Sequence, residues 1–299
     1  MEVGSNIGSA GHALRVTDPR SGEDAEPVFC MVYADHRPER VINDPPRTFI
    51  CQARPLLANF HNNLEAMNPK NEELTERYQQ LWDGAIEAVR NGQVTIDPLL
   101  ARGEPDRRRC LTVLLRPSVA VQQAVTGFLD ELSTLEPDQY YYEAGELHVT
   151  VLSLFTAVVD YGRLMAHYDR YVEAVNAALA YAPSFGIEFN GVTITREAVM
   201  IQGFPEDAVL GQLRDALRRE LRNRDLIEGL DGRYFLQTAH ITGTRFRRPL
   251  RNNEIYARTL ESYRRHKFGR TTVQELQLVR NDWYMSRASV ETMRKYELR

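Results

Sequence analysis

The chain has 299 residues, of which 43% are hydrophobic and 26% are charged, and its formal net charge is −4. This composition is typical of a soluble globular protein with one large domain or two modest ones. It contains no run of about 20 apolar residues that could span a membrane, and we expect no secretory signal from its first residues. Its three cysteines (Cys30, Cys51 and Cys110) suit neither a disulfide framework nor a metal site. We expect a cytoplasmic, monomeric protein with no membrane association, no cofactor and no metal.

The charge is unevenly distributed. Residues 210–299 contain 20 basic and 11 acidic residues, whereas residues 1–209 contain 17 and 30. A basic region attracts polyanions such as nucleotides or RNA ends, but the arginine-rich segment 214–224 is equally consistent with a solvated helix. The negative net charge argues against avid binding to long nucleic acid.

The first third of the chain predicts an extension to a larger domain. Residues 1–27 are rich in Gly, Ser, Asp and Glu, which predicts disorder. Residues 28–107 predict a mainly helical N-terminal extension that packs on the core, with a strand over 28–33 and helices over 56–67 and 72–90. The last helix has an apolar stripe at helical spacing, with Asn71 as its cap and Gly92 as its end.

From Cys110 onward the pattern of strands and helices occurs twice. The first half predicts a strand over 111–115, a helix over 118–132, the aromatic run Tyr140–Tyr142, a strand at His148 and a helix over 161–180. The second half predicts a hairpin of 185–194 with 198–203, a helix over 208–223, a strand at His240 and closing strands over 272–279 and 292–298. Strands interleaved with single helices in this doubled order predict an α+β fold with two lobes.

Two short motifs carry the chemistry: His148-Val149-Thr150 and His240-Ile241-Thr242. Residues i and i+2 of a strand share one face, so each motif presents an imidazole beside a hydroxyl. Two facing histidines suit phosphodiester chemistry without metal, because one accepts a proton and the other donates one near neutral pH. The threonines can bind phosphate oxygens. The alternative is a pair of core histidines with satisfied hydrogen bonds.

With these motifs, the chain resembles the two-histidine (2H) phosphoesterase superfamily, which contains 2′–5′ RNA ligase-like proteins and cyclic phosphodiesterases. The resemblance covers residues 108–299. It rests on the two motifs and the 92 residues between their histidines. Further support comes from Leu147–Leu152, Ala239–Thr242, and the segments 185–192, 273–279 and 296–298.

The resemblance implies a duplicated, bilobal fold with an antiparallel sheet in each lobe, outer helices, and a central cleft lined by both motifs. It implies that His148 and His240 are the acid/base pair and that Thr150 and Thr242 bind the substrate phosphate. The implied activity is metal-independent cleavage of phosphodiesters or cyclic phosphates next to a ribose hydroxyl.

Three further residues are candidate substrate contacts. Tyr142 and Phe246 could stack on a base, although aromatic residues are more often in the core. Arg245 could bind a phosphate bidentately. Strict strand alternation puts Arg245 on the face opposite His240, so this role requires a bend in the strand.

We therefore expect a phosphodiesterase or cyclic phosphodiesterase whose partner is a nucleotide or RNA-end substrate. The alternatives are a non-catalytic nucleic-acid-binding or regulatory module on the same fold, and an enzyme that joins or trims the ends of long RNA. The sequence does not select the substrate, the role of residues 28–107, or which histidine is the base. If one histidine must be neutral and the other protonated, the pH profile of kcat/KM should be bell-shaped, with both limbs within about two units of pH 6.5.

Overall fold

The computed structural model describes residues 70–232 and 235–299. These residues all belong to the second of the two compact units into which the chain divides, residues 53–299. The disorder expected over 1–27, the strand expected over 28–33 and the helix expected over 56–67 lie outside the described residues.

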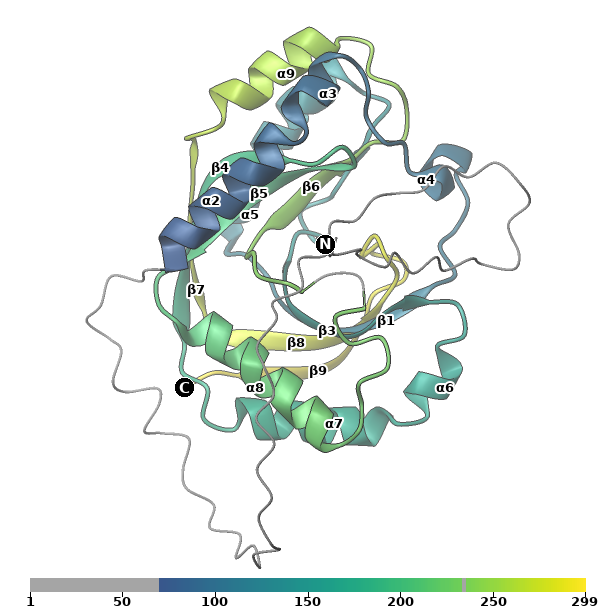
Figure 1. Ribbon diagram of the computed structural model, residues 1–299, viewed down its shortest axis with the longest axis vertical. Coiled ribbons are helices and arrows are strands. Elements are labelled where there is room, and N and C mark those ends of the chain that lie inside the picture. The colour runs from purple at the N-terminus through teal and green to yellow at the C-terminus, as the bar shows by residue number, and fades with distance from the viewer. Residues whose placement is uncertain (1–69, 233–234) are drawn as a thin grey trace, which may run out of the picture. The chain divides into compact units, whose positions relative to one another are not determined.

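The described strands form one nine-stranded antiparallel sheet, which Figure 1 shows curling around. The strands are β1 (Arg109–Leu115), β2 (Tyr140–Tyr141), β3 (Val149–Val158), β4 (Phe185–Ile194), β5 (Ala198–Pro205), β6 (Ile241–Arg245), β7 (Lys267–Val273), β8 (Glu275–Asn281) and β9 (Glu291–Glu297). Their order is β7-β4-β5-β6-β3-β1-β8-β9, with β2 paired to β6. The fold is therefore α+β, as the sequence predicts.

Apart from the short strand β2, the sheet consists of two sets of four strands that meet in its middle. One set is β7-β4-β5-β6 and the other is β3-β1-β8-β9. They join where β6 lies beside β3, through the register pair Val149 and Ile241. The resemblance implied an antiparallel sheet in each of two lobes, whereas the structure joins the two sets into one continuous sheet.

Helices cover the sheet and connect its strands. They are α2 (Lys70–Asp83), α3 (Ile86–Arg90), α4 (Pro98–Arg102), α5 (Val119–Leu135), α6 (Gly162–Met165), α7 (Tyr168–Leu179), α8 (Val209–Asn223) and α9 (Asn253–Ser262). Helix α2 packs on β4 and β5, α5 on β7, and α8 on both α7 and β3. None of the helices in the described part of the chain is long and apolar enough to cross a membrane.

Several predicted boundaries differ from those in the structure. The predicted helix 72–90 is interrupted after Asp83, where Gly84 has low helix propensity. Lys70 is already helical, so Asn71 lies inside the helix and is not its cap. The predicted strand 272–279 is divided at Gln274 between β7 and β8, which belong to opposite halves of the sheet. The sequence pattern did not predict α9. The predicted helix end at Gly92 agrees with the structure, because Gly92 follows the end of α3 and has a φ of 69°, as expected for a residue that ends a helix.

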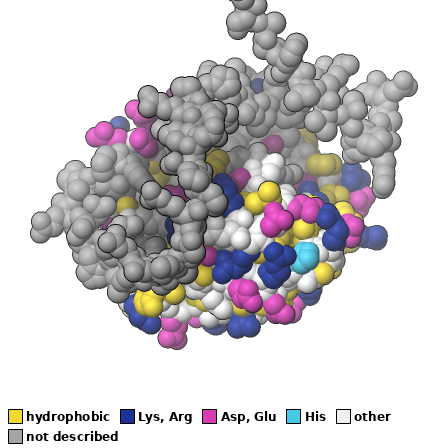
Figure 2. Space-filling view, turned by 60° about the horizontal axis from the view of Figure 1, so that its bottom comes forward, with side chains coloured by type: hydrophobic (Ala, Val, Ile, Leu, Met, Phe, Trp, Pro, Cys, Tyr) yellow, Lys and Arg dark blue, Asp and Glu magenta, His cyan; other side chains and the backbone are white. Residues whose placement is uncertain are grey.

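The arginine-rich helix α8 is only partly solvated. Arg214 is 4% exposed and Arg218 is 3% exposed, so both belong to the interior. Arg224 and Arg219 instead pair with Glu220 near the surface. On the described surface visible in Figure 2, basic and acidic side chains are interspersed. The interpretation of this segment as a solvated helix was therefore wrong for its two buried arginines.

Candidate active site

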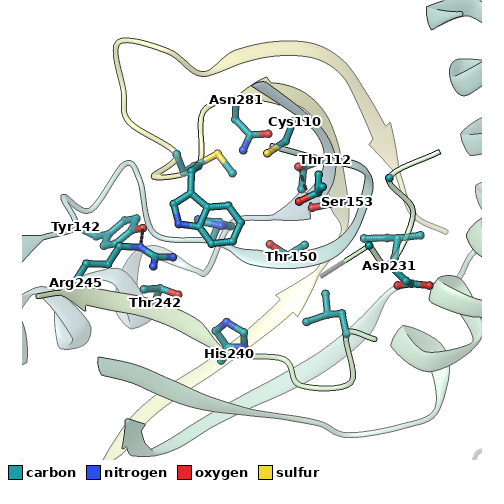
Figure 3. Close-up of a pocket in the computed structure, with 18 residues that line it drawn as sticks. Cys110, Thr112, Tyr142, Thr150, Ser153, Asp231, His240, Thr242, Arg245 and Asn281 are labelled. Carbon is teal, nitrogen blue, oxygen red and sulfur yellow. Dashed lines mark hydrogen bonds between the residues drawn. The ribbon is translucent and has the colours of Figure 1, made fainter. Parts of the chain in front are cut away.

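The two His-x-Thr motifs lie side by side at the junction of the two halves. His148 directly precedes β3 and His240 directly precedes β6. The residues that follow them, Val149 and Ile241, are register partners. Both histidines line one pocket, together with Thr150 and Thr242. Figure 3 shows His240 and the two threonines in this pocket. The structure thus brings together all four residues that the motifs single out.

His148 is held by a backbone carbonyl. Its Nδ1 lies 2.8 Å from the carbonyl oxygen of Glu146. A carbonyl can only accept, so Nδ1 carries a proton, and in the neutral ring Nε2 is the acceptor. Burial lowers the pKa of His148 to about 4, and the positive charges of Arg116 and Arg245 act in the same direction, against the hydrogen bond to Glu146.

His240 is hydrogen-bonded to a hydroxyl group, which can act as donor or as acceptor. Its Nδ1 lies 2.7 Å from Oγ1 of Thr238, and a hydroxyl can donate or accept. Burial lowers the pKa of His240 to about 3, and the charges of His148, Arg214 and Arg245 add to this effect. In the unliganded protein, both imidazoles are therefore neutral at pH 7.

Helix α2 fixes the backbone just before His240. The hydroxyl of Tyr78, a residue 1% exposed, accepts hydrogen bonds from the backbone N–H groups of Gly203 and Ala239, each at 3.2 Å. It also donates to the carbonyl of Gly203 at 3.1 Å. A Cβ on Gly203 would lie 2.0 Å from the carbonyl oxygen of Ala239, so this close approach requires glycine. Residues from the predicted N-terminal extension therefore position the second motif.

Arg214 of α8 connects the two motif segments through hydrogen bonds to their backbone carbonyls. Its guanidinium donates to the carbonyl oxygens of Thr150 and Val151 at 2.9 Å. It also donates to those of Gln237 at 3.0 Å and Thr238 at 2.8 Å. One buried cation thus spans the start of β3 and the segment that leads into His240.

A bulge in β6 brings Arg245 to the same side as His240. Thr242 pairs with Met200 and Thr244 with Val199, so Gly243 is an extra residue in β6. A Cβ on Gly243 would lie 2.8 Å from a methyl group of Leu129, so the bulge is packed tightly. The bulge is the bend that strict alternation required, and Arg245 lines the pocket.

Arg245 and Tyr142 form one unit of the pocket wall. The Arg245 Nε donates to the Tyr142 hydroxyl at 2.9 Å, as drawn in Figure 3. This leaves the two Nη nitrogens of Arg245 for an anion. Tyr142, which is 3% exposed, thus lines the pocket and orients the arginine at the same time.

Phe246 does not belong to the pocket. It is 0% exposed and packs edge-on against Tyr256, with ring centroids 6.2 Å apart. The prediction that Phe246 contacts the substrate was wrong, because its side chain points into the core and not into the pocket. Arg247 also points elsewhere, since its Nε donates to the carbonyl oxygen of Asp138.

Other pocket residues have no signal in the sequence. Asn281, Trp283 and Met285 line it from the end of β8 and the following turn. Asp231 lines it from the segment after α8, where Arg218 binds both of its carboxylate oxygens at 2.7 and 2.9 Å. Among the residues that the structure describes, no group of three or more His, Cys, Asp or Glu side chains is arranged to hold a metal ion.

Comparison with known families agrees with this geometry. The model of the 2′-5′ RNA ligase superfamily matches residues 118–283, a span that includes both motifs. The chain belongs to the 2′-5′ RNA ligase superfamily. The resemblance drawn from the two motifs is thereby confirmed over the matched residues. None of the curated protein sequences matches the chain significantly.

Solved structures of similar proteins come from several bacteria. TT0787 of Thermus thermophilus is 16% identical, with a TM-score of 0.46 over 64% of this chain and 98% of its own. E. coli LigT complexed with 3′-AMP is 13% identical, with a TM-score of 0.40 over 64% of this chain and 98% of its own. The conserved protein ATU0111 from Agrobacterium tumefaciens is 13% identical, with a TM-score of 0.48 over 70% of this chain and 97% of its own.

Proposed function

We propose that this protein is a phosphodiesterase that cleaves a nucleotide or RNA-end phosphodiester, or a cyclic phosphate, by acid/base catalysis from two histidines without a metal. The observation that carries the proposal is the adjacency of the two motifs: His148 and His240 precede register-paired residues and line one pocket. Family membership supports it, because both motifs fall within the matched residues.

We assign the role of base to His148, which its hydrogen bond allows. Its Nδ1 is committed to the Glu146 carbonyl, so the neutral ring has its lone pair on Nε2. Nε2 takes a proton from the attacking water as the new bond to phosphorus forms. In the alternative transfer to a ribose hydroxyl, Nε2 takes the proton of that hydroxyl instead.

His240 then acts as the acid. The Thr238 hydroxyl can accept from its Nδ1–H, so the imidazolium form keeps its hydrogen bond. The negative charge of a bound phosphate raises the pKa of both histidines and offsets the burial that lowers them. As the bond from phosphorus to the leaving oxygen breaks, His240 donates its proton to that oxygen.

The phosphate is held by Thr150, Thr242 and Arg245. The two threonines are the motif hydroxyls, and both line the pocket beside the histidines. Arg245 is oriented by Tyr142 and presents a fixed positive charge. Donors placed in advance around the non-bridging oxygens stabilise the charge that builds up in the transition state.

A product assay tests the proposal. The full chain is incubated in excess EDTA with 2′,3′-cyclic nucleotides, 2′–5′ and 3′–5′ dinucleotides, and an RNA with a 3′-terminal phosphodiester. Cleavage of at least one of them, at a rate unchanged by EDTA, is the expected result. Binding of these compounds with no turnover across the panel would favour the non-catalytic binding module.

A further inference from the structure

The pocket has a second polar end, away from His240. Figure 3 shows Asn281, Cys110, Thr112 and Ser153 gathered on the side of Thr150 opposite His240. The strand register explains this cluster. Cys110 pairs with Asn281 across β1 and β8, and Thr112 pairs with Ser153 across β1 and β3. Three adjacent strands therefore converge on one small polar region.

Asn281 has an unsatisfied carbonyl in this region. It is 4% exposed, and its Nδ2 donates to the backbone carbonyl of Asp282 at 2.8 Å. That contact fixes the orientation of the amide, because a carbonyl oxygen requires a donor opposite it. Oδ1 is buried and has no hydrogen-bond partner among the described residues. A buried acceptor without a donor is uncommon and calls for an explanation.

The surroundings of Asn281 suit a flat, hydrogen-bonding ligand. The hydroxyls of Thr112 and Ser153 lie 3.4 Å apart, and either can be the donor. Trp283, two residues after Asn281, also lines the pocket, and the Arg245 guanidinium lies 5.2 Å from its ring centroid. An aromatic face near acceptors and hydroxyls can stack a nucleobase while its edge is read.

We propose that this end of the pocket, the Asn281 subsite, binds a nucleobase that carries an exocyclic amino group beside a ring nitrogen, as adenine and cytosine do. Asn281 Oδ1 accepts from the amino group, and a hydroxyl of Thr112 or Ser153 donates to the ring nitrogen. A base with a keto group at this position would set an oxygen against Oδ1, two acceptors facing each other. The proposal rests on the proposed function, which places the phosphate between the two motifs.

Calorimetric titration of the full chain with two ligands tests the subsite. Adenosine 3′-monophosphate has the amino group, and purine riboside 3′-monophosphate differs only in lacking it. We expect the adenosine ligand to bind about tenfold more tightly, as for one hydrogen bond to an otherwise unsatisfied group. Equal affinities, or tighter binding of uridine 3′-monophosphate, would overturn the proposal.

A variant assigns the preference to one side chain. Asn281→Leu should bind the adenosine ligand about tenfold more weakly and the purine riboside ligand unchanged, whereas the exposed Asn223→Leu should keep the wild-type preference. A preference retained in Asn281→Leu would overturn the assignment. Should that variant fail to fold, the two-ligand comparison on the wild type still decides. Because the assay measures binding, an adenosine preference without turnover supports the subsite while the proposed function fails.

Discussion

Val149 and Ile241 are register partners across the junction of β3 and β6, and each is the middle residue of a His-x-Thr motif. Both side chains are 0% exposed. Because side chains alternate along a strand, burial of the middle residue on one face turns the histidine and threonine of each motif toward the other face. One backbone pair therefore aligns both catalytic candidates on one pocket.

Removal of the Tyr78 hydroxyl should weaken this alignment. In Tyr78→Phe, the N–H groups of Gly203 and Ala239 lose their acceptor in a buried place. We expect a loss of about 1–3 kcal/mol in the free energy of unfolding. We also expect a lower kcat with a nearly unchanged KM, because Ala239 directly precedes His240. Urea unfolding and steady-state kinetics measure both effects.

Tyr181→Phe is the matched control, since Tyr181 is 44% exposed. It should leave stability and kcat unchanged. A Tyr78→Phe protein with wild-type kcat would show that the hydroxyl contributes only to stability.

The motif threonines should act mainly in the transition state. Thr150→Ala and Thr242→Ala each remove a hydroxyl that lines the pocket, and kcat should fall by about 10²-fold while KM changes little. Thr150→Ser and Thr242→Ser keep the hydroxyl and should retain most of the activity. A rise in KM with intact kcat would point instead to uniform binding of substrate and transition state.

The lowered pKa values of His148 and His240 change the expected pH dependence of activity. The reactive form needs one protonated histidine, and above about pH 4 this form is a minority of the free enzyme. We therefore expect kcat/KM to fall by about tenfold per unit from pH 5 to pH 8, rather than to show limbs near pH 6.5. A bound phosphate raises both pKa values, so the kcat profile should lie at higher pH. A kcat/KM maximum between pH 7 and 8 would contradict this.

The same shifts predict a loss of stability in acid. The unfolded chain titrates its histidines near pH 6.5, whereas the folded protein resists protonation until about pH 4 for His148 and about pH 3 for His240. The unfolded state thus binds more protons as the pH falls below 6.5, so stability present above that pH is lost toward pH 4. The variant with both His148→Gln and His240→Gln should lose less between pH 7 and 4.5, in thermal unfolding.

His167→Gln is the control for this titration, because His167 is exposed. Its acid sensitivity should equal that of the wild type. An equal loss of melting temperature in the wild type and in the double variant would show that the two pocket histidines are not the source of the acid sensitivity.

The parts of the fold that could be predicted are those encoded locally. The hairpin of β4 and β5 and helix α5 follow from patterns within the segments themselves. The two motifs were found because histidine and threonine at i and i+2 are informative without knowledge of the partner strand. Helix α9 and the division of 272–279 depend on which half of the sheet each segment joins, which no local pattern records.

The parts of the site that could not be predicted depend on contacts between strands. Arg245 was a candidate from the sequence, but the bulge at Gly243 that brings it to the pocket was not predicted, because a glycine in a strand does not by itself reveal a bulge. Asn281 faces the pocket because β8 lies beside β1, far away in the sequence. The role of Arg214 could not be predicted either, because it lies in the arginine-rich segment 214–224 and its carbonyl partners lie in distant segments of the chain.

The most direct measurement of the central claim is kcat/KM in excess EDTA for the wild type, His148→Ala, His240→Ala and the double variant, on the best substrate of the panel. We predict that each single variant loses about 10²-fold or more. The double variant should lose little beyond the worse single one, because the two histidines act as a unit, and His167→Ala should match the wild type. Folded single variants with wild-type rates, or activity abolished by EDTA and restored by Mn²⁺ or Zn²⁺, would contradict the two-histidine mechanism.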